Sequence, residues 1–78
     1  MEVIVYSSGH CASCKEAISF FEEQGIAYKQ FDVEVNKEHF QEMLRLGGIA
    51  TPFILIEDSA FHYFDRDKIK EVLMRTNA

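Results

Sequence analysis

Positively charged residues are scarce in this sequence, and long hydrophobic runs are absent. Lysine and arginine together number 8 against 13 aspartate and glutamate residues, and the net charge is −5 at pH 7. Nucleic-acid-binding domains usually present a basic stripe, which these few cations do not form. No apolar run is long enough to span a bilayer, and the start of the chain lacks the basic and apolar segments of a secretory signal. We therefore expect neither nucleic acid nor membrane among its partners, and a cytoplasmic location.

Cysteine and proline are also rare, with two copies and one copy among 78 residues. In the reducing cytoplasm, two cysteines are more often catalytic, redox-sensing or metal-binding than a permanent cross-link. Hydrophobic residues make up 47% of the chain, which is enough for one small core. No repeat, low-complexity segment or linker interrupts the pattern. The sequence thus predicts one domain over residues 1–78, and we expect it to act as a monomer.

The hydrophobic periodicity changes several times along the chain and predicts four strands and three helices. The strands are expected over residues 2–7, 27–33, 53–56 and 60–64, with a polar turn over residues 57–59. The helices are expected over residues 12–24, from Asn36 to the Gly47-Gly48 pair, and after the capping residue Asp65. Gly25 should end the first helix in a left-handed conformation.

Each predicted helix has an apolar face that should pack on the sheet. These faces comprise Cys14, Ala17, Ile18 and Phe21 in the first helix, Phe40, Met43 and Leu44 in the second, and Ile69, Val72 and Leu73 in the third. The order of elements implies a parallel first pair of strands and an antiparallel second pair. The predicted fold class is α/β, a βαβαββα chain whose four-stranded mixed sheet is flanked by three helices.

The two cysteines form a C-x-x-C motif, Cys11-Ala12-Ser13-Cys14, between the first predicted strand and the first predicted helix. At such a junction the first sulfur lies beside unpaired backbone N–H groups and the positive end of the helix dipole. Both favour the thiolate, which is the nucleophilic form of cysteine. The position of the motif therefore indicates a reactive dithiol.

The strand, C-x-x-C motif and helix, followed by the single proline before the third strand, resemble the thioredoxin fold in its minimal glutaredoxin form. The resemblance covers nearly the whole chain. It implies that Pro52 lies beside the two cysteines with a cis peptide bond. It also implies that the backbone of Thr51 pairs with a substrate chain, as an added strand would. We expect the small residues Ala12 and Ser13 to let a protein substrate approach closely.

We expect Cys11 to attack a substrate disulfide, and Cys14 to resolve the mixed disulfide that results. The predicted activity is thiol–disulfide exchange that reduces disulfides, chiefly those of proteins. His10 and Lys15 are candidates for lowering the pKa of Cys11, although either could be an ordinary solvent-facing residue.

Departures from the family motifs bear on the source of electrons. Many glutathione-using glutaredoxins carry C-P-Y-C, a basic residue ahead of it, and a Gly-Gly pair after the third strand. This chain has C-A-S-C after Ser7-Ser8-Gly9-His10, and the acidic Glu57-Asp58 after its third strand. The chain length and the segment Gly25-Ile26-Ala27-Tyr28 resemble those of redoxins that serve ribonucleotide reductase and are reduced by thioredoxin reductase. Glutathione and thioredoxin reductase with NADPH both remain possible sources, as does a bacterial paralogue with another thiol partner.

Other functions compete with redox exchange. Zinc could use the cysteines with His10, His39 or His62, but the chain has no second C-x-x-C motif and no H-x-x-x-H motif. An iron–sulfur cluster shared between two subunits through Cys11 is implied by some members of the resembling family. A non-enzymatic interaction module on the same fold is a third alternative. Our expectation is an enzyme with no resident metal or cofactor.

Overall fold

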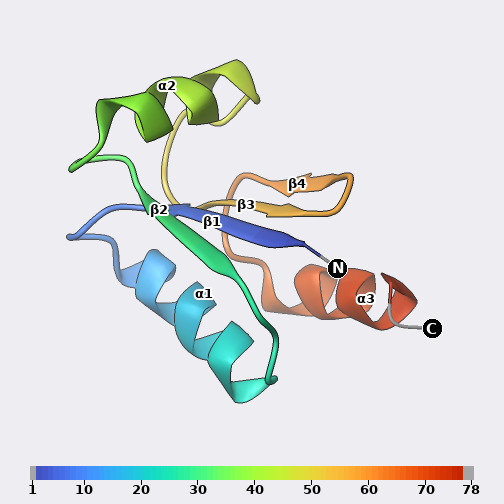
Figure 1. The fold of residues 1–78 in the computed structure, drawn as a ribbon. Coiled ribbons are helices and arrows are strands. Elements are labelled where there is room, and N and C mark those ends of the chain that lie inside the picture. Colours follow the sequence, from blue (N-terminus) through green and yellow to red (C-terminus); the bar gives the residue numbers. More distant parts are fainter. Residues whose placement is uncertain (1, 77–78) are drawn as a thin grey trace.

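The computed structural model describes residues 2–76 of the chain, and Figure 1 labels their helices and strands. The elements are β1 (Val3–Ser7), α1 (Ala12–Glu23), β2 (Lys29–Asp32), α2 (Lys37–Arg45), β3 (Phe53–Ile56), β4 (Ser59–Phe61) and α3 (Arg66–Thr76). This order is the predicted one. The ends of the predicted domain, residue 1 and residues 77–78, lie outside the described residues. Within residues 2–76, no helix is both long and apolar enough to cross a membrane.

The four strands form one mixed sheet in the order β2-β1-β3-β4. The pair β1 and β2 is parallel, whereas β1–β3 and β3–β4 are antiparallel. Tyr6 pairs with Phe53 and Ser7 pairs with Asp32. The end of β1, the end of β2 and the start of β3 therefore meet at one edge of the sheet, and α1 begins after a short loop at this edge (Figure 1).

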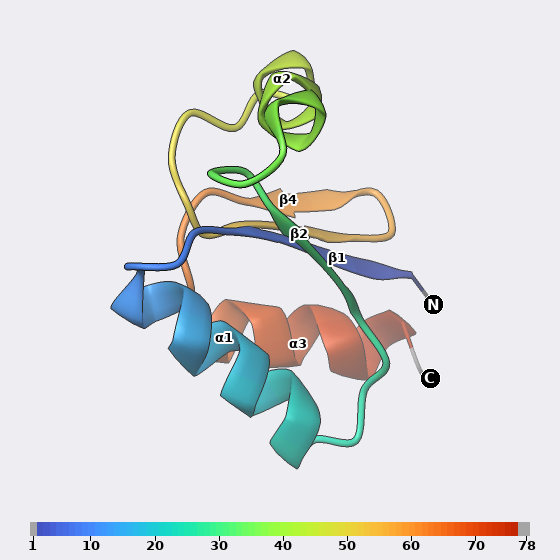
Figure 2. The same ribbon diagram turned by 60° about the vertical axis from the view of Figure 1, so that its left-hand side comes forward.

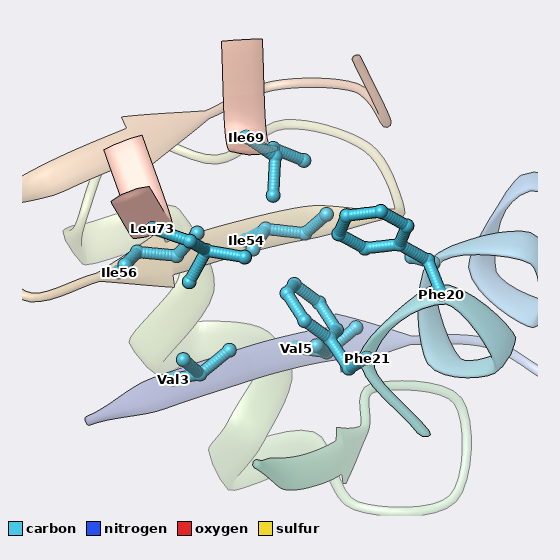
Figure 3. Close-up of a cluster of buried hydrophobic side chains, with 9 residues drawn as sticks. Val3, Val5, Phe20, Phe21, Ile54, Ile56, Ile69 and Leu73 are labelled. Carbon is cyan, nitrogen blue, oxygen red and sulfur yellow. The ribbon is translucent and has the colours of Figure 1, made fainter. Parts of the chain in front are cut away.

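Helices α1 and α3 cover one face of the sheet and α2 lies on the other (Figure 2). The larger core lies on the side of α1 and α3, as Figure 3 shows for its main side chains. This core comprises Val3, Val5, Ala17, Phe20, Phe21, Ile54, Ile56, Ile69 and Leu73. A smaller cluster of Tyr6, Met43 and Phe53 holds α2 to the opposite face.

Local interactions explain where the helices begin and end. The side-chain oxygen of Asn36 accepts a hydrogen bond from the backbone N of Glu38 at 2.9 Å, which caps α2. Asp65 caps α3 in the same way through the backbone N of Lys68 at 3.2 Å. Gly25 follows α1 with a φ of 67°, the left-handed conformation that was predicted. All three end residues were identified correctly from the sequence.

The predicted core of the second helix was partly wrong. Met43 is buried, but Phe40 and Leu44 are 41% and 45% exposed. The short helix α2 meets the sheet along a narrow line through Met43, so residues on its flank remain in solvent. In α1 the reverse error occurred, because Phe20 is buried beside Phe21 although only Phe21 was assigned to the core. Helix α3 packs against that side of α1 and covers Phe20.

Strand bounds also differ from prediction. The second strand covers Lys29–Asp32 rather than residues 27–33. The last strand covers Ser59–Phe61 rather than residues 60–64. The difference at β4 arises because only Glu57 and Asp58 form the turn after β3, with Glu57 at a φ of 51°. A two-residue turn returns the chain to the sheet one residue earlier than expected.

Candidate functional site

The two cysteines form a disulfide at the start of α1. Their Cα atoms are 5.2 Å apart, within the usual range for a disulfide. Cys11 is the N-cap of α1 with extended backbone, and its Sγ accepts a hydrogen bond from the backbone N of Cys14 at 3.1 Å. The first sulfur therefore takes the place that a serine or aspartate oxygen usually occupies at a helix start. An N–H group and a helix dipole at this position are features that favour the thiolate form of a reduced cysteine.

The two sulfurs differ in their access to solvent. Cys11 is partly exposed, whereas Cys14 is only 2% exposed and faces the interior from the first turn of α1. A disulfide in solution can therefore reach the Cys11 sulfur and not the Cys14 sulfur. This asymmetry is the geometry required for one attacking and one resolving thiol.

The segment before β3 forms the other side of the site. The antiparallel register that joins Tyr6 to Phe53 continues beyond the strands, because the Ser8 and Thr51 hydroxyl oxygens lie 3.0 Å apart in a hydrogen bond. The Thr51–Pro52 peptide bond is cis, the isomer that the family resemblance implies. Pro52 is buried, and Thr51 is partly exposed. The structure thus brings Thr51 beside the loop that leads to Cys11.

The remaining predicted site residues lie around the cysteines on the surface. Ala12 and Ser13 are exposed in the first turn of α1. His10 and Lys15 are exposed as well, and within residues 2–76 no hydrogen bond or ion pair joins either side chain to a cysteine. The contact of Lys15 with Cys11 is the helical bond from its backbone N to the Cys11 carbonyl, at 3.3 Å. The proposed effect of both residues on the Cys11 pKa stays a prediction.

Two acidic residues near the site were missed by the sequence reasoning. Glu34 accepts a hydrogen bond from the backbone N of Gly9 at 2.7 Å, within the loop before Cys11. Asp32 ends β2 and lines a cavity that Cys14 also lines. The predicted parallel pairing of the first two strands could have indicated Asp32 and Glu34, since the carboxyl ends of parallel strands meet at one edge of the sheet.

The histidines do not form a metal site with the cysteines. Within residues 2–76, no three histidine, cysteine or acidic side chains are grouped so that they could hold a metal ion. The His39 ring stacks on Phe31, with ring centres 4.3 Å apart. The His62 ring packs against Phe53 at 5.4 Å. Both rings contact the hydrophobic face below α2, whereas the cysteines lie at the start of α1.

Known proteins similar to this chain share the motif-bearing region. A family model described as Glutaredoxin matches residues 3–61. The glutaredoxin-like protein NrdH of Lactococcus lactis subsp. cremoris (strain MG1363) is 31% identical over 62 residues, which cover 80% of this chain and 86% of that protein. NrdH of Lactococcus lactis subsp. lactis (strain IL1403) matches with the same identity and coverage.

Solved structures confirm the predicted thioredoxin-like fold. The thioredoxin-like protein BC3987 superposes with a TM-score of 0.85 at 22% identity, covering 90% of this chain and 97% of that one. The glutaredoxin-like NrdH-redoxin of Escherichia coli, studied for its thioredoxin-like activity profile, gives a TM-score of 0.83 at 19% identity. That match covers 92% of this chain and 95% of the other. At these identities the superpositions establish the fold and nothing further.

Proposed function

Because this chain belongs to the glutaredoxin family, it is a thiol–disulfide oxidoreductase, and we propose that Cys11 is its attacking sulfur and Cys14 its resolving sulfur. The observation that carries this assignment is the position of the Cys11 sulfur. It is the sulfur that solvent reaches, and it accepts the first N–H bond of α1 from Cys14. The competing metal-binding and non-enzymatic functions have no comparable support.

In the proposed cycle, the Cys11 thiolate attacks one sulfur of a substrate disulfide. A bond forms between Cys11 and that sulfur, and the other substrate sulfur leaves as a thiol after taking up a proton. Cys14 then attacks the Cys11 sulfur, which releases the second substrate thiol and leaves the Cys11–Cys14 disulfide. Two electrons pass from the protein to the substrate, and a reductase partner restores the dithiol.

For the substrate, we propose a protein disulfide that docks beside Thr51. Ala12, Ser13 and Gly9 are exposed and small, so a substrate backbone can approach Cys11 closely. Thr51 precedes β3, where its backbone groups can pair with an extended substrate segment. This docking would place the substrate disulfide next to Cys11 while Pro52 forms the buried floor of the site.

For the electron source, we propose a thioredoxin reductase with NADPH in preference to glutathione. The carboxylates of glutathione favour cations at the site. Lys15 is exposed there, but Glu34 brings a carboxylate to Gly9 in the loop before Cys11. The E. coli NrdH-redoxin is described by its thioredoxin-like activity profile, and the Lactococcus relatives carry the same protein name. The cytoplasmic location and the monomeric state stay predictions.

A coupled assay tests both parts of the proposal. NADPH oxidation is followed with a protein disulfide as substrate, once with thioredoxin reductase and once with glutathione and glutathione reductase. We expect turnover with thioredoxin reductase, none with Cys11→Ser, and a trapped mixed disulfide with Cys14→Ser. Faster turnover through glutathione would overturn the proposed electron source, and full dithiol turnover by Cys14→Ser would overturn the assigned roles.

A further inference from the structure

We propose that Glu34 selects among substrates by its charge, favouring disulfides with cationic neighbours and disfavouring disulfides flanked by carboxylates. The inference rests on the proposed function, because it concerns disulfides that react with Cys11. It adds a specificity-determining residue to the site. It also narrows the proposed substrate class to protein disulfides that have lysine or arginine beside them.

The register of the sheet brings Glu34 to the site. The parallel pairing of β1 with β2 continues past the strands, because the backbone N of Val33 donates to the Ser7 carbonyl at 2.9 Å. The residues after β2 therefore run beside the loop that leads to Cys11. There Oε1 of Glu34 accepts a hydrogen bond from the backbone N of Gly9 at 2.7 Å. Two residues span at most about 7 Å, so this carboxylate lies within about 10 Å of the Cys11 backbone.

Glu34 is held at both its backbone and its side chain. Oδ1 of Asp32 accepts hydrogen bonds from the backbone N of Glu34 at 2.8 Å and of Val35 at 3.0 Å, which shapes the turn after β2. The carboxylate of Glu34 is in turn bound by the Gly9 N–H group. A free glutamate side chain samples many rotamers. These bonds instead keep the Glu34 charge in one place beside the loop before Cys11.

No cation in the described part of the chain neutralises this charge. Across residues 2–76 the ion pair that forms joins Lys29 to Glu2 at 3.7 Å, and no lysine or arginine pairs with Glu34. Its side-chain partner, the Gly9 amide, is neutral. Lys15 is exposed one turn into α1, whereas Glu34 is exposed on the loop that precedes the helix. The Glu34 charge therefore faces the solvent from which a substrate arrives.

This charge acts on the groups that flank a substrate disulfide. A disulfide must bring one of its sulfurs to Cys11, so its neighbouring groups come close to the loop that Glu34 holds. A lysine or arginine there is attracted to Glu34, and an aspartate or glutamate is repelled. At about 10 Å in water, the interaction of two unit charges changes a rate about twofold. The same residue should thus raise the rate for basic disulfides and lower it for acidic ones.

The test uses small disulfides that share the core S–CH₂–CH₂ and differ in the charge of the end group. Cystamine carries ammonium groups, 3,3′-dithiodipropionate carries carboxylates, and hydroxyethyl disulfide is neutral. The reduced full-length chain is mixed with each of them at neutral pH and low ionic strength. The reaction is quenched with acid, and the oxidised fraction is measured by mass spectrometry.

The variant is Glu34→Gln, because glutamine keeps an oxygen for the Gly9 N–H group and removes the charge. Asp58→Asn is the matched control. Asp58 is exposed in the turn after β3, at the other end of the sheet, so this change alters the net charge equally without altering the site. Hydroxyethyl disulfide reports any change in the reactivity of Cys11 itself, since such a change affects all the disulfides alike.

We expect Glu34→Gln to slow cystamine about twofold and to speed 3,3′-dithiodipropionate about twofold, so that the ratio of the two rates falls about fourfold. Salt at about 1 M should abolish this difference, because it shortens the Debye length to about 3 Å. Asp58→Asn should keep the parental ratio.

A parental ratio in Glu34→Gln, or an equal fall in Asp58→Asn, would overturn the proposal, since a residue that only holds the loop would change all the rates together. Rates that are unaffected by Cys11→Ser would instead overturn the proposed function, so the two failures are distinguishable.

Discussion

Gly48 lies in the segment between α2 and β3, and we predict that Gly48→Ala destabilises the protein. A Cβ atom at this position would lie 2.6 Å from Cγ of Phe53 and 2.7 Å from Cγ of Met43. Both neighbours are fully buried, so neither can move into solvent. Overpacking of this kind costs about 1–3 kcal/mol. In a domain of this size each kcal/mol lowers the midpoint of thermal unfolding by about 4–8 °C.

The assay is thermal unfolding of both redox forms, followed by circular dichroism, with Gly9→Ala as the matched control. A Cβ atom at Gly9 would meet only Oε1 of Glu34, at the ordinary contact distance of 3.7 Å. We expect the Gly48 variant to unfold at least about 4 °C below the Gly9 variant. Combining Gly48→Ala with Met43→Ala should cost less than the two separate losses together, because the new methyl group enters the vacated space. Equal midpoints for the two glycine variants would refute the packing argument.

Two further predictions concern the smaller core under α2. Met43→Ala should cost about 2–5 kcal/mol and Phe40→Ala less than half as much, as measured by urea denaturation, because Met43 is buried and Phe40 is 41% exposed. Tyr6→Phe should cost about 1–2 kcal/mol, since the Tyr6 hydroxyl donates a 2.7 Å hydrogen bond to the Glu42 carboxylate. Burial, and then the hydrogen bond to Glu42, raise the pKa of Tyr6 above its usual value. The folded state therefore holds the Tyr6 proton more tightly, so stability should be complete below about pH 10 and fall as the pH rises further. Denaturation curves between pH 8 and 11 should show this loss in the parent chain and a smaller one in Tyr6→Phe.

The fold was predictable because its main determinants are local. Each of three helix ends is fixed by one side chain or one backbone angle, at Asn36, Asp65 and Gly25. These residue types are typical of helix ends and can be recognised in the sequence. The core of α2 was not predictable in the same way. Phe40 and Leu44 have helical spacing with Met43, yet whether they are buried depends on how much of α2 the sheet reaches, which periodicity does not encode.

The reactive dithiol was also predictable, because a C-x-x-C motif at a strand-to-helix junction has a direct chemical meaning. Thr51 and Pro52 could be linked to it only through the family resemblance, since Thr51 lies 37 positions after Cys14 and no local pattern spans that distance. The structure makes the link through register. The pairing of Tyr6 with Phe53 brings the residues after β1 opposite those before β3, and the Ser8–Thr51 bond follows.

The same register reasoning explains why the environment of Cys14 is asymmetric. On one side of β1, the antiparallel strand β3 brings its start to the site, and these residues are uncharged. On the other side, the parallel strand β2 brings its end, and Ser7 there lies beside Asp32. A substrate that docks along Thr51 therefore reaches Cys11 from the β3 side, while the cavity and its carboxylate lie on the β2 side of α1.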